Sequence, residues 1–155
     1  MTTSINQRSL YQQVILEHSK KPWHRGKTNP IHGYHRGHNP LCGDTIELTV
    51  QLDQAGDRIE EVKFEGEGCA IAIASADLMA DAVRGKSVEE ALLMVQCFRD
   101  MVMGQDQFPK DLRKLNVLQG ISQFPVRIKC ATLSWHTLKT VLESPRSAAP
   151  LVESE

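Results

Sequence analysis

Residues 45–52 read Thr-Ile-Glu-Leu-Thr-Val-Gln-Leu, with polar and apolar side chains in strict alternation. Successive side chains of a strand point to opposite faces, so this stretch predicts a strand with one buried face. A turn sequence at residues 54–57 follows, and residues 58–65 carry apolar residues suited to a return strand. The two segments together predict an antiparallel hairpin.

The sequence on either side of this hairpin predicts helices. Apolar residues recur at helical spacing in the flanking segments, and residues 87–90, Ser-Val-Glu-Glu, match a capping box. Residues 23–40 are rich in Gly, Pro, His and Asn and show no periodicity, so we expect a long surface loop there. Helices are expected at residues 10–18, 71–84 and 87–102, shortly after Pro109, and from Pro125 to Leu142.

This order of elements indicates an α+β domain, in which helices pack on one face of a small antiparallel sheet of about three strands. A chain of 155 residues is large enough to bury the core of one domain. We place that single domain at residues 1–144. Residues 145–155 are rich in Ser, Ala, Pro and Glu, and we expect them to form a flexible tail.

Composition and charge argue against several classes of function. A formal net charge of −1 gives no support to nucleic-acid binding. The sequence has no apolar run approaching the ~20 residues that span a bilayer, and its first residues lack an apolar signal core. We therefore expect a cytoplasmic protein without nucleic-acid or membrane partners.

Three of the four cysteines lie in sequences suited to a reactive or metal-bound sulfur. Cys42 is in the turn sequence Asn-Pro-Leu-Cys-Gly-Asp, Cys69 follows Gly-Glu-Gly before an apolar helix, and Cys130 follows Arg-Ile-Lys. The thiolate is the form that binds metal, and helix starts and cationic neighbours stabilise it. In a chain that is not exported, such cysteines indicate metal or redox chemistry rather than disulfides.

Asp44, two residues after Cys42, is placed to supply a fourth ligand. The hairpin brings Cys42 and Cys69 together at its open end, and Cys130 points away from the apolar stripe of its helix. The three thiolates and the carboxylate could form a tetrahedral set for zinc or hold an iron–sulfur cluster. Arg127 and Lys129 are candidates to offset the negative charge of that set.

The remaining cysteine and the clustered histidines are weaker candidates. Cys97 lies on the flank of a helix stripe, and free cysteine is among the most buried residue types, so we expect it to be a packing residue. Four histidines crowd the segment before Cys42, but a glycine-rich segment offers no defined geometry for a metal. We expect these histidines to be solvated or to face a partner; they are His24, His32, His35 and His38.

Three motifs occur in an order that is far more specific than any one of them. They are Asn-Pro-Leu-Cys-Gly-Asp at residues 39–44, Gly-Glu-Gly-Cys-Ala-Ile at 66–71, and Phe-Pro-Val-Arg-Ile-Lys-Cys-Ala at 124–131. With these motifs the chain resembles the SufU/IscU family of iron–sulfur cluster assembly proteins over nearly the whole domain. The IscU branch typically has histidine where this chain has Lys129, and the stretch between the second and third motifs looks longer here. Both differences favour the SufU branch.

This resemblance implies a zinc site made by Cys42, Asp44, Cys69 and Cys130. It also implies a sulfur carrier with sulfurtransferase-type activity, in which Cys42 accepts persulfide sulfur from a pyridoxal-phosphate cysteine desulfurase of the SufS type. In that picture a histidine of the desulfurase replaces Cys42 on the metal, and the freed thiolate attacks the persulfide. The sulfur then passes to downstream Suf assembly components for cluster biogenesis.

Two other functions could use the same residues. The first is an IscU-like scaffold that assembles a [2Fe–2S] cluster, with iron or a transient cluster in place of zinc. The second is a zinc-stabilised binding module whose thiols carry no chemistry. Metal analysis of the purified protein, paired with a desulfurase stimulation assay, distinguishes the three functions.

Overall fold

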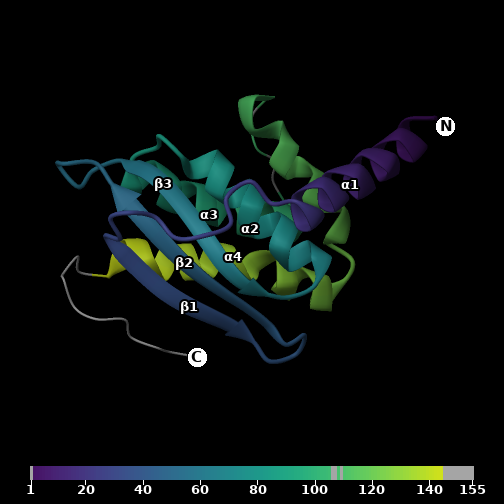
Figure 1. Ribbon diagram of the computed structural model, residues 1–155. Helices are drawn as coiled ribbons and strands as arrows, with labels where there is room; N and C mark the ends of the chain where they lie inside the picture. The colour runs from purple at the N-terminus through teal and green to yellow at the C-terminus, as the bar shows by residue number, and fades with distance from the viewer. Residues whose placement is uncertain (1, 106–107, 109, 145–155) are drawn as a thin grey trace.

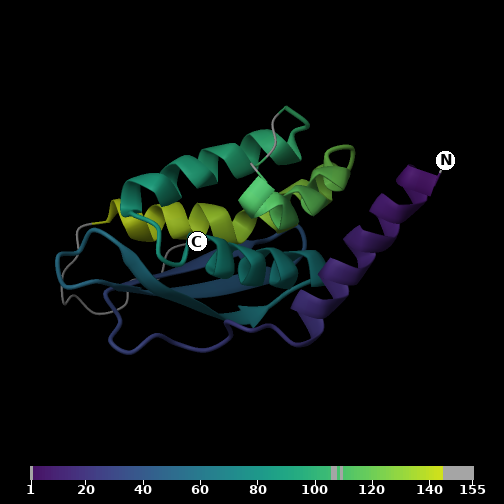
Figure 2. The ribbon, with the colours of Figure 1, turned by 90° about the horizontal axis from the view of Figure 1, so that it is seen from above.

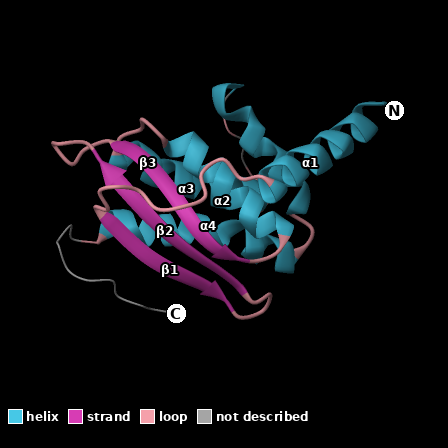
Figure 3. Ribbon diagram, in the orientation of Figure 1, coloured by secondary structure: helices cyan, strands magenta, loops and turns pink. Residues whose placement is uncertain are grey.

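The computed structural model describes residues 2–105, 108 and 110–144. Within these ranges the chain forms a three-stranded antiparallel sheet, in the order β1-β2-β3, together with helices (Figures 1 and 3). The expected α+β class with a small antiparallel sheet is therefore confirmed. Residues 145–155, where we expected a flexible tail, lie outside the described residues. The elements are α1 (Thr2–Lys20), β1 (Gly33–Asn39), β2 (Asp44–Leu52), β3 (Ile59–Glu67), α2 (Ala70–Val83), α3 (Val88–Val102), the 3-10 helix η1 (Lys110–Ile121) and α4 (Pro125–Glu143).

The strands β2 and β3 form the hairpin that the alternating sequence predicts. They pair antiparallel, with Leu48 opposite Phe64 and Thr45 opposite Glu67. The four apolar residues of β2 are at most 5% exposed, so the face of the sheet that they occupy is the core face; they are Ile46, Leu48, Val50 and Leu52. The capping box is also present: Glu90 N–H donates to Ser87 Oγ, and Ser87 N–H donates to Glu90 Oε1.

The third strand lies where we expected a loop. β1 pairs antiparallel with β2 from end to end, so the long surface loop expected at residues 23–40 is wrong for this part of the chain. On the side facing α4 the strand carries Gly33 and Gly37, which add no apolar side chain to an alternating pattern. A Cβ atom would overlap Val141 Cγ1 at the first glycine and Thr137 Oγ1 at the second. These glycines therefore allow α4 to pack closely on the strand.

The segment between α1 and β1 crosses the face of the sheet opposite the helices (Figure 2). Gly26 N–H donates to the carbonyl of Phe64 on β3 at 2.8 Å. Further along, Thr28 N–H donates to Thr49 Oγ1 on β2 at 2.9 Å. The segment thus runs from the edge at β3 toward β1, and it covers the middle of the outer face.

The helices lie in layers on the core face of the sheet. α2 and α4 pack on the strands, α3 packs on the far side of α4, and α1 contacts α2 and projects away from the domain (Figure 2). Phe98 of α3 stacks on Trp135 of α4 with ring centroids 4.4 Å apart, and Trp135 Nε1–H donates to Ser75 Oγ on α2 at 3.1 Å. Trp135 therefore joins three helices. Among the described helices, none has both the length and the apolar content needed to cross a membrane.

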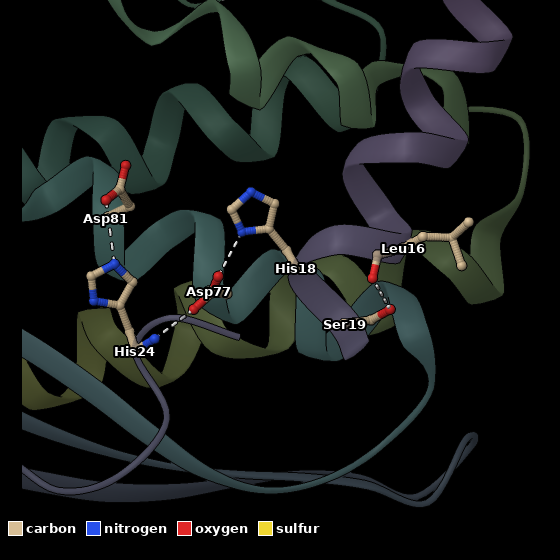
Figure 4. Close-up of polar contacts among 6 residues, drawn as sticks. All are labelled: Leu16, His18, Ser19, His24, Asp77 and Asp81. Atoms are coloured by element: carbon tan, nitrogen blue, oxygen red, sulfur yellow. Dashed lines mark hydrogen bonds and ion pairs between the residues drawn. The ribbon is translucent and has the colours of Figure 1, made fainter. Parts of the chain in front are cut away.

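A buried polar network fastens the end of α1 to α2 (Figure 4). His18 Nδ1–H donates to Asp77 Oδ2 at 2.6 Å, and both residues are buried. The other carboxylate oxygen of Asp77 accepts the backbone N–H of His24 at 2.8 Å. The ring of His24 in turn contacts Asp81 Oδ1 at 3.3 Å. Both oxygens of the buried Asp77 carboxylate are thereby hydrogen-bonded, as burial of a charge requires.

Candidate metal centre

The three functional cysteine segments meet at one end of the sheet. Cys42 lies in the turn between β1 and β2, and Asp44 is the first residue of β2. Cys69 is the N-cap residue of α2, directly after β3, and Cys130 lies in the second turn of α4. Because β2 and β3 are paired, the starts of β2 and α2 are neighbours, and α4 packs across them.

The sulfurs of Cys42 and Cys130 are 3.0 Å apart, although 88 positions separate the two residues in the chain. With a carboxylate oxygen of Asp44 they form a set in which every ligand atom lies within 4.8 Å of every other. Among the described residues this is the one group of three or more His, Cys, Asp and Glu side chains with that proximity. Cys130 is 3% exposed and Cys42 is half-buried, so the first residue is enclosed and the second is partly accessible.

Asp44 is fully buried and only half of its carboxylate is hydrogen-bonded. Oδ1 accepts the backbone N–H of Cys69 at 2.9 Å, whereas Oδ2 has no hydrogen-bond partner among the described residues. A Cβ atom at Gly68 would lie 2.7 Å from Asp44 Oδ1, so a glycine is needed there for this approach. A buried carboxylate oxygen without a partner is costly, and a metal ion would satisfy it.

Cys69 is brought to the site but is turned partly toward its own helix. Its sulfur accepts the backbone N–H of Ala72 at 3.4 Å, as an N-cap side chain does. The residue is exposed, and its sulfur does not belong to the set within 4.8 Å. Its thiol is nevertheless near enough to help raise the pKa of the Cys130 thiol. All four expected ligands therefore lie at one place, while their joint binding of a metal stays a prediction.

The electrostatics of the site favour a bound cation. The pKa of the Cys130 thiol is raised well above its ordinary value, first because burial disfavours the thiolate. The neighbouring Cys42 and Cys69 thiols and the Asp44 carboxyl raise this pKa further. Three sulfurs and one oxygen are a donor set that suits tetrahedral zinc, and thiolate sulfurs also suit iron–sulfur clusters. The residues present thus fit such a metal.

The two expected supporting cations lie on the exposed side of the start of α4. The guanidinium of Arg127 lies 4.6 Å from the centroid of the Phe124 ring, and its charge acts on Tyr11 of α1. Burial raises the pKa of Tyr11, and Arg127 opposes that shift. Lys129 is exposed as well. Their role in offsetting the charge of the thiolates stays a prediction.

The four histidines before Cys42 do not form one cluster. The expectation that all are solvated or face a partner is wrong for His24, which is buried against α2. His32 Nδ1 accepts the backbone N–H of Leu52 at 2.9 Å. His38 Nδ1 pairs with Thr45 Oγ1 at 3.0 Å, and burial lowers the pKa of His35. These side chains therefore make separate contacts along β1 and its approach.

Sequence reasoning missed one residue that shapes the Cys42 turn. The Oδ1 atom of Asn39 accepts the backbone N–H of Leu41 at 3.2 Å, and its carbonyl accepts Gly43 N–H at 2.8 Å. Asn39 is buried and organises the turn with both its side chain and its main chain. The signal in the sequence was the Asn-Pro pair itself, since asparagine commonly bonds to the backbone two residues further on.

The fold and this cysteine–aspartate site define a class of protein, and comparison identifies it. Residues 10–131 match the family model of the NifU-like N-terminal domain, and the chain belongs to this family. The zinc-dependent sulfurtransferase SufU of Bacillus subtilis is 47% identical over 140 residues, which cover 90% of this chain and 93% of that protein. The iron–sulfur cluster assembly scaffold protein IscU of Streptococcus pyogenes is 43% identical over 145 residues, covering 93% and 89%.

Solved structures agree with this assignment. The crystal structure of SufU from Fervidobacterium islandicum AW-1 superposes with a TM-score of 0.78 at 34% identity, and covers 87% of this chain and 98% of that one. The N-terminal part of a NifU-like protein from Brucella abortus superposes with a TM-score of 0.76 at 18% identity. The latter likeness concerns the fold alone. The resemblance to the SufU/IscU family is thereby confirmed.

Proposed function

We propose that this protein acts in iron–sulfur cluster assembly as a zinc-dependent sulfur carrier, which accepts sulfur on Cys42 from a SufS-type cysteine desulfurase. The relative of B. subtilis that is 47% identical is a zinc-dependent sulfurtransferase, which supports this function. The observation that carries the proposal is the geometry of the site, where two sulfurs lie 3.0 Å apart and the buried Oδ2 of Asp44 has no hydrogen-bond partner within the part of the chain that the structure describes. The sulfur then passes to downstream Suf assembly components.

The metal would be held by Cys42, Asp44, Cys69 and Cys130. Bound zinc would supply the positive charge that keeps these three thiols deprotonated at neutral pH. The protein provides the remaining chemistry. The hydrogen bond from the Cys69 backbone N–H orients the Asp44 carboxylate. The hydrogen bond from Leu41 N–H to Asn39 Oδ1 stabilises the turn that positions Cys42.

Cys42 is the cysteine best placed to accept sulfur from a partner. Cys130 is enclosed, and Cys69 is fixed at the start of a helix by the hydrogen bond from Ala72. Cys42 lies instead in a turn, next to Gly43, where an added Cβ would meet nothing within 4 Å. A turn in open space can move its thiolate outward at smaller structural cost than a helix start can.

The transfer step is thiol exchange at sulfur. The Cys42 thiolate attacks the outer sulfur of the cysteine persulfide on the desulfurase. A new S–S bond forms at Cys42, the S–S bond of the desulfurase persulfide breaks, and the desulfurase cysteine leaves as a thiolate. No other oxidant or reductant is needed, because the sulfane sulfur carries its oxidation state with it.

The decisive experiment combines metal analysis with sulfur transfer. The protein, isolated anaerobically, should contain about one zinc per chain, be colourless and stimulate a SufS-type desulfurase. Mass spectrometry should find the extra sulfur first on Cys42, and Cys42→Ala should abolish uptake while the matched control Cys97→Ala retains it. Near-stoichiometric iron and sulfide in the isolated protein would instead establish the scaffold function. Complete unfolding on zinc removal, without any desulfurase stimulation before removal, would establish the binding module.

Asp44 offers a second test of the metal site. Asp44→Ala should leave the fold intact and make zinc exchange faster, because one ligand of four is replaced by water. Asp44→Asn is the matched variant, since its oxygen can still accept the backbone N–H of Cys69 while its charge is lost. Slower zinc loss to a chelator from Asp44→Ala than from the wild type would contradict a ligand role for this carboxylate.

A further inference from the structure

The distance between the sulfurs of Cys42 and Cys130 lies between the values for two zinc-bound sulfurs and for a disulfide. Two sulfurs bound to one tetrahedral zinc at about 2.3 Å each are about 3.8 Å apart. The sulfurs of a disulfide are about 2.05 Å apart. The observed separation of 3.0 Å is shorter than the first distance and longer than the second. The two sulfurs are thus within about 1 Å of either separation.

We propose that Cys130 is a resolving cysteine, which attacks the persulfide on Cys42 and releases its outer sulfur as sulfide. This inference rests on the proposed function, because it concerns the fate of the sulfur that Cys42 has accepted. It adds a second activity to that of the carrier, since the chain would liberate sulfide without an external thiol. The product is a disulfide between Cys42 and Cys130.

The atoms and electrons of this step balance within the protein. The S–S bond of the persulfide breaks, and a new bond joins Cys42 Sγ to Cys130 Sγ. The Cys130 thiolate supplies the electron pair of the new bond, and the outer sulfur leaves as hydrosulfide with the proton of the persulfide. It takes up the two electrons that the two cysteine sulfurs lose on forming the disulfide. A dithiol reductant must then reopen the disulfide before the next cycle.

The position of Cys130 suits this role better than that of the other cysteines. Its sulfur is in contact with Cys42, whereas the sulfur of Cys69 lies outside the close set and accepts a hydrogen bond from the start of α2. Cys97 is on α3, packed against the hydrophobic core. At 3% exposure Cys130 is poorly accessible to thiols in solution, so an attack from Cys130 is an internal reaction between groups already held together.

A matched pair of variants isolates the proposed attack. Cys130→Ser and Cys69→Ser each remove one expected metal ligand, but only the first removes the sulfur that contacts Cys42. Wild type and both variants are loaded with inorganic polysulfide, so that the test does not depend on transfer from a desulfurase. They are then desalted and kept anaerobic without added thiol, while sulfide release and the persulfide on Cys42 are followed.

The expected result is release of about one sulfide per Cys42 persulfide from wild type and from Cys69→Ser. Release from Cys130→Ser should be slower by at least about tenfold, since the internal thiol is gone. A second readout needs no variant: peptide mass spectrometry of the decayed wild type should show Cys42 cross-linked to Cys130. A cross-link to Cys69, or equal decay in the two variants, would overturn the inference. Failure of desulfurase transfer alone would count against the proposed function and not against this step.

Discussion

Gly37→Ala tests how closely α4 packs on β1. The added methyl group would overlap Thr137 Oγ1 and would lie 3.1 Å from Leu133 Cδ1, so at least one side chain of α4 must move. Thr137 is 3% exposed and its hydroxyl donates to the carbonyl of Leu133 at 2.7 Å, so moving it disturbs a hydrogen bond in a packed interface. Overpacking of this kind costs about 1–3 kcal/mol.

Gly120→Ala is the matched control, because Gly120 is exposed and an added Cβ there would meet nothing within 4 Å. Both variants reduce the conformational entropy of the unfolded chain, a gain of about 0.4–1 kcal/mol where the backbone is compatible. The difference between the two variants therefore isolates the steric term. In a domain of this size 1 kcal/mol corresponds to about 2–4 °C in Tm, so Gly37→Ala should melt roughly 2–12 °C below Gly120→Ala.

The assay is urea and thermal unfolding followed by circular dichroism, with a chelator present so that metal binding does not shift the stabilities. A double-mutant cycle with Thr137→Ala adds a specific check, because removing the hydroxyl removes the main clash. Gly37→Ala should cost less in that background, with a coupling of about 1–2 kcal/mol. Equal stability of Gly37→Ala and Gly120→Ala, or no coupling to Thr137, would refute the close packing of α4 on this strand.

Three further predictions concern other parts of the chain. His18→Ala should cost about 1.5–3 kcal/mol at pH 7 in urea unfolding, because it removes a hydrogen-bond donor from the buried Asp77 carboxylate; a loss below about 0.5 kcal/mol would contradict this. The backbone N–H of Ser87 is the main cause of the lowered pKa of Glu90, so the stability that Glu90 adds is present above the ordinary glutamate pKa and is lost as the pH falls through the lowered one. The difference in Tm between wild type and Glu90→Ala should accordingly shrink as the pH falls below the glutamate range. A difference that grows in acid would contradict this prediction. Cys97→Ser should cost on the order of 1 kcal/mol and leave zinc content and sulfur uptake unchanged, whereas loss of zinc would place Cys97 in the metal site.

Local patterns predicted the elements whose information is local. The alternation in residues 45–52 predicted β2, and the capping box predicted the start of α3 at Val88. The sequence pattern did not predict β1, because two of its core-facing positions are Gly33 and Gly37. Glycine has no apolar side chain that could contribute to an alternating pattern. A glycine that permits close packing and a glycine that forms a turn look the same in a sequence.

For the candidate site, too, local sequence identified the residues but not the distances between them. Three motifs in a fixed order were enough to select three cysteines and Asp44, because each thiol has its own local sequence. The motifs do not predict the spatial distance between these segments, since 88 positions separate the two cysteines whose sulfurs are in contact. The same holds for His18 and Asp77, which are 59 positions apart and share a buried hydrogen bond.

The sequence by itself thus determined the class of fold, the hairpin and the set of residues that we propose as metal ligands. These follow from side-chain periodicity and from the chemistry of individual side chains. Only the tertiary structure decided which Asp44 oxygen has no hydrogen-bond partner among the described residues, which thiol is enclosed, and which two sulfurs are in contact. Those properties depend on how α4 packs against the end of the hairpin, and packing joins atoms that no local pattern relates.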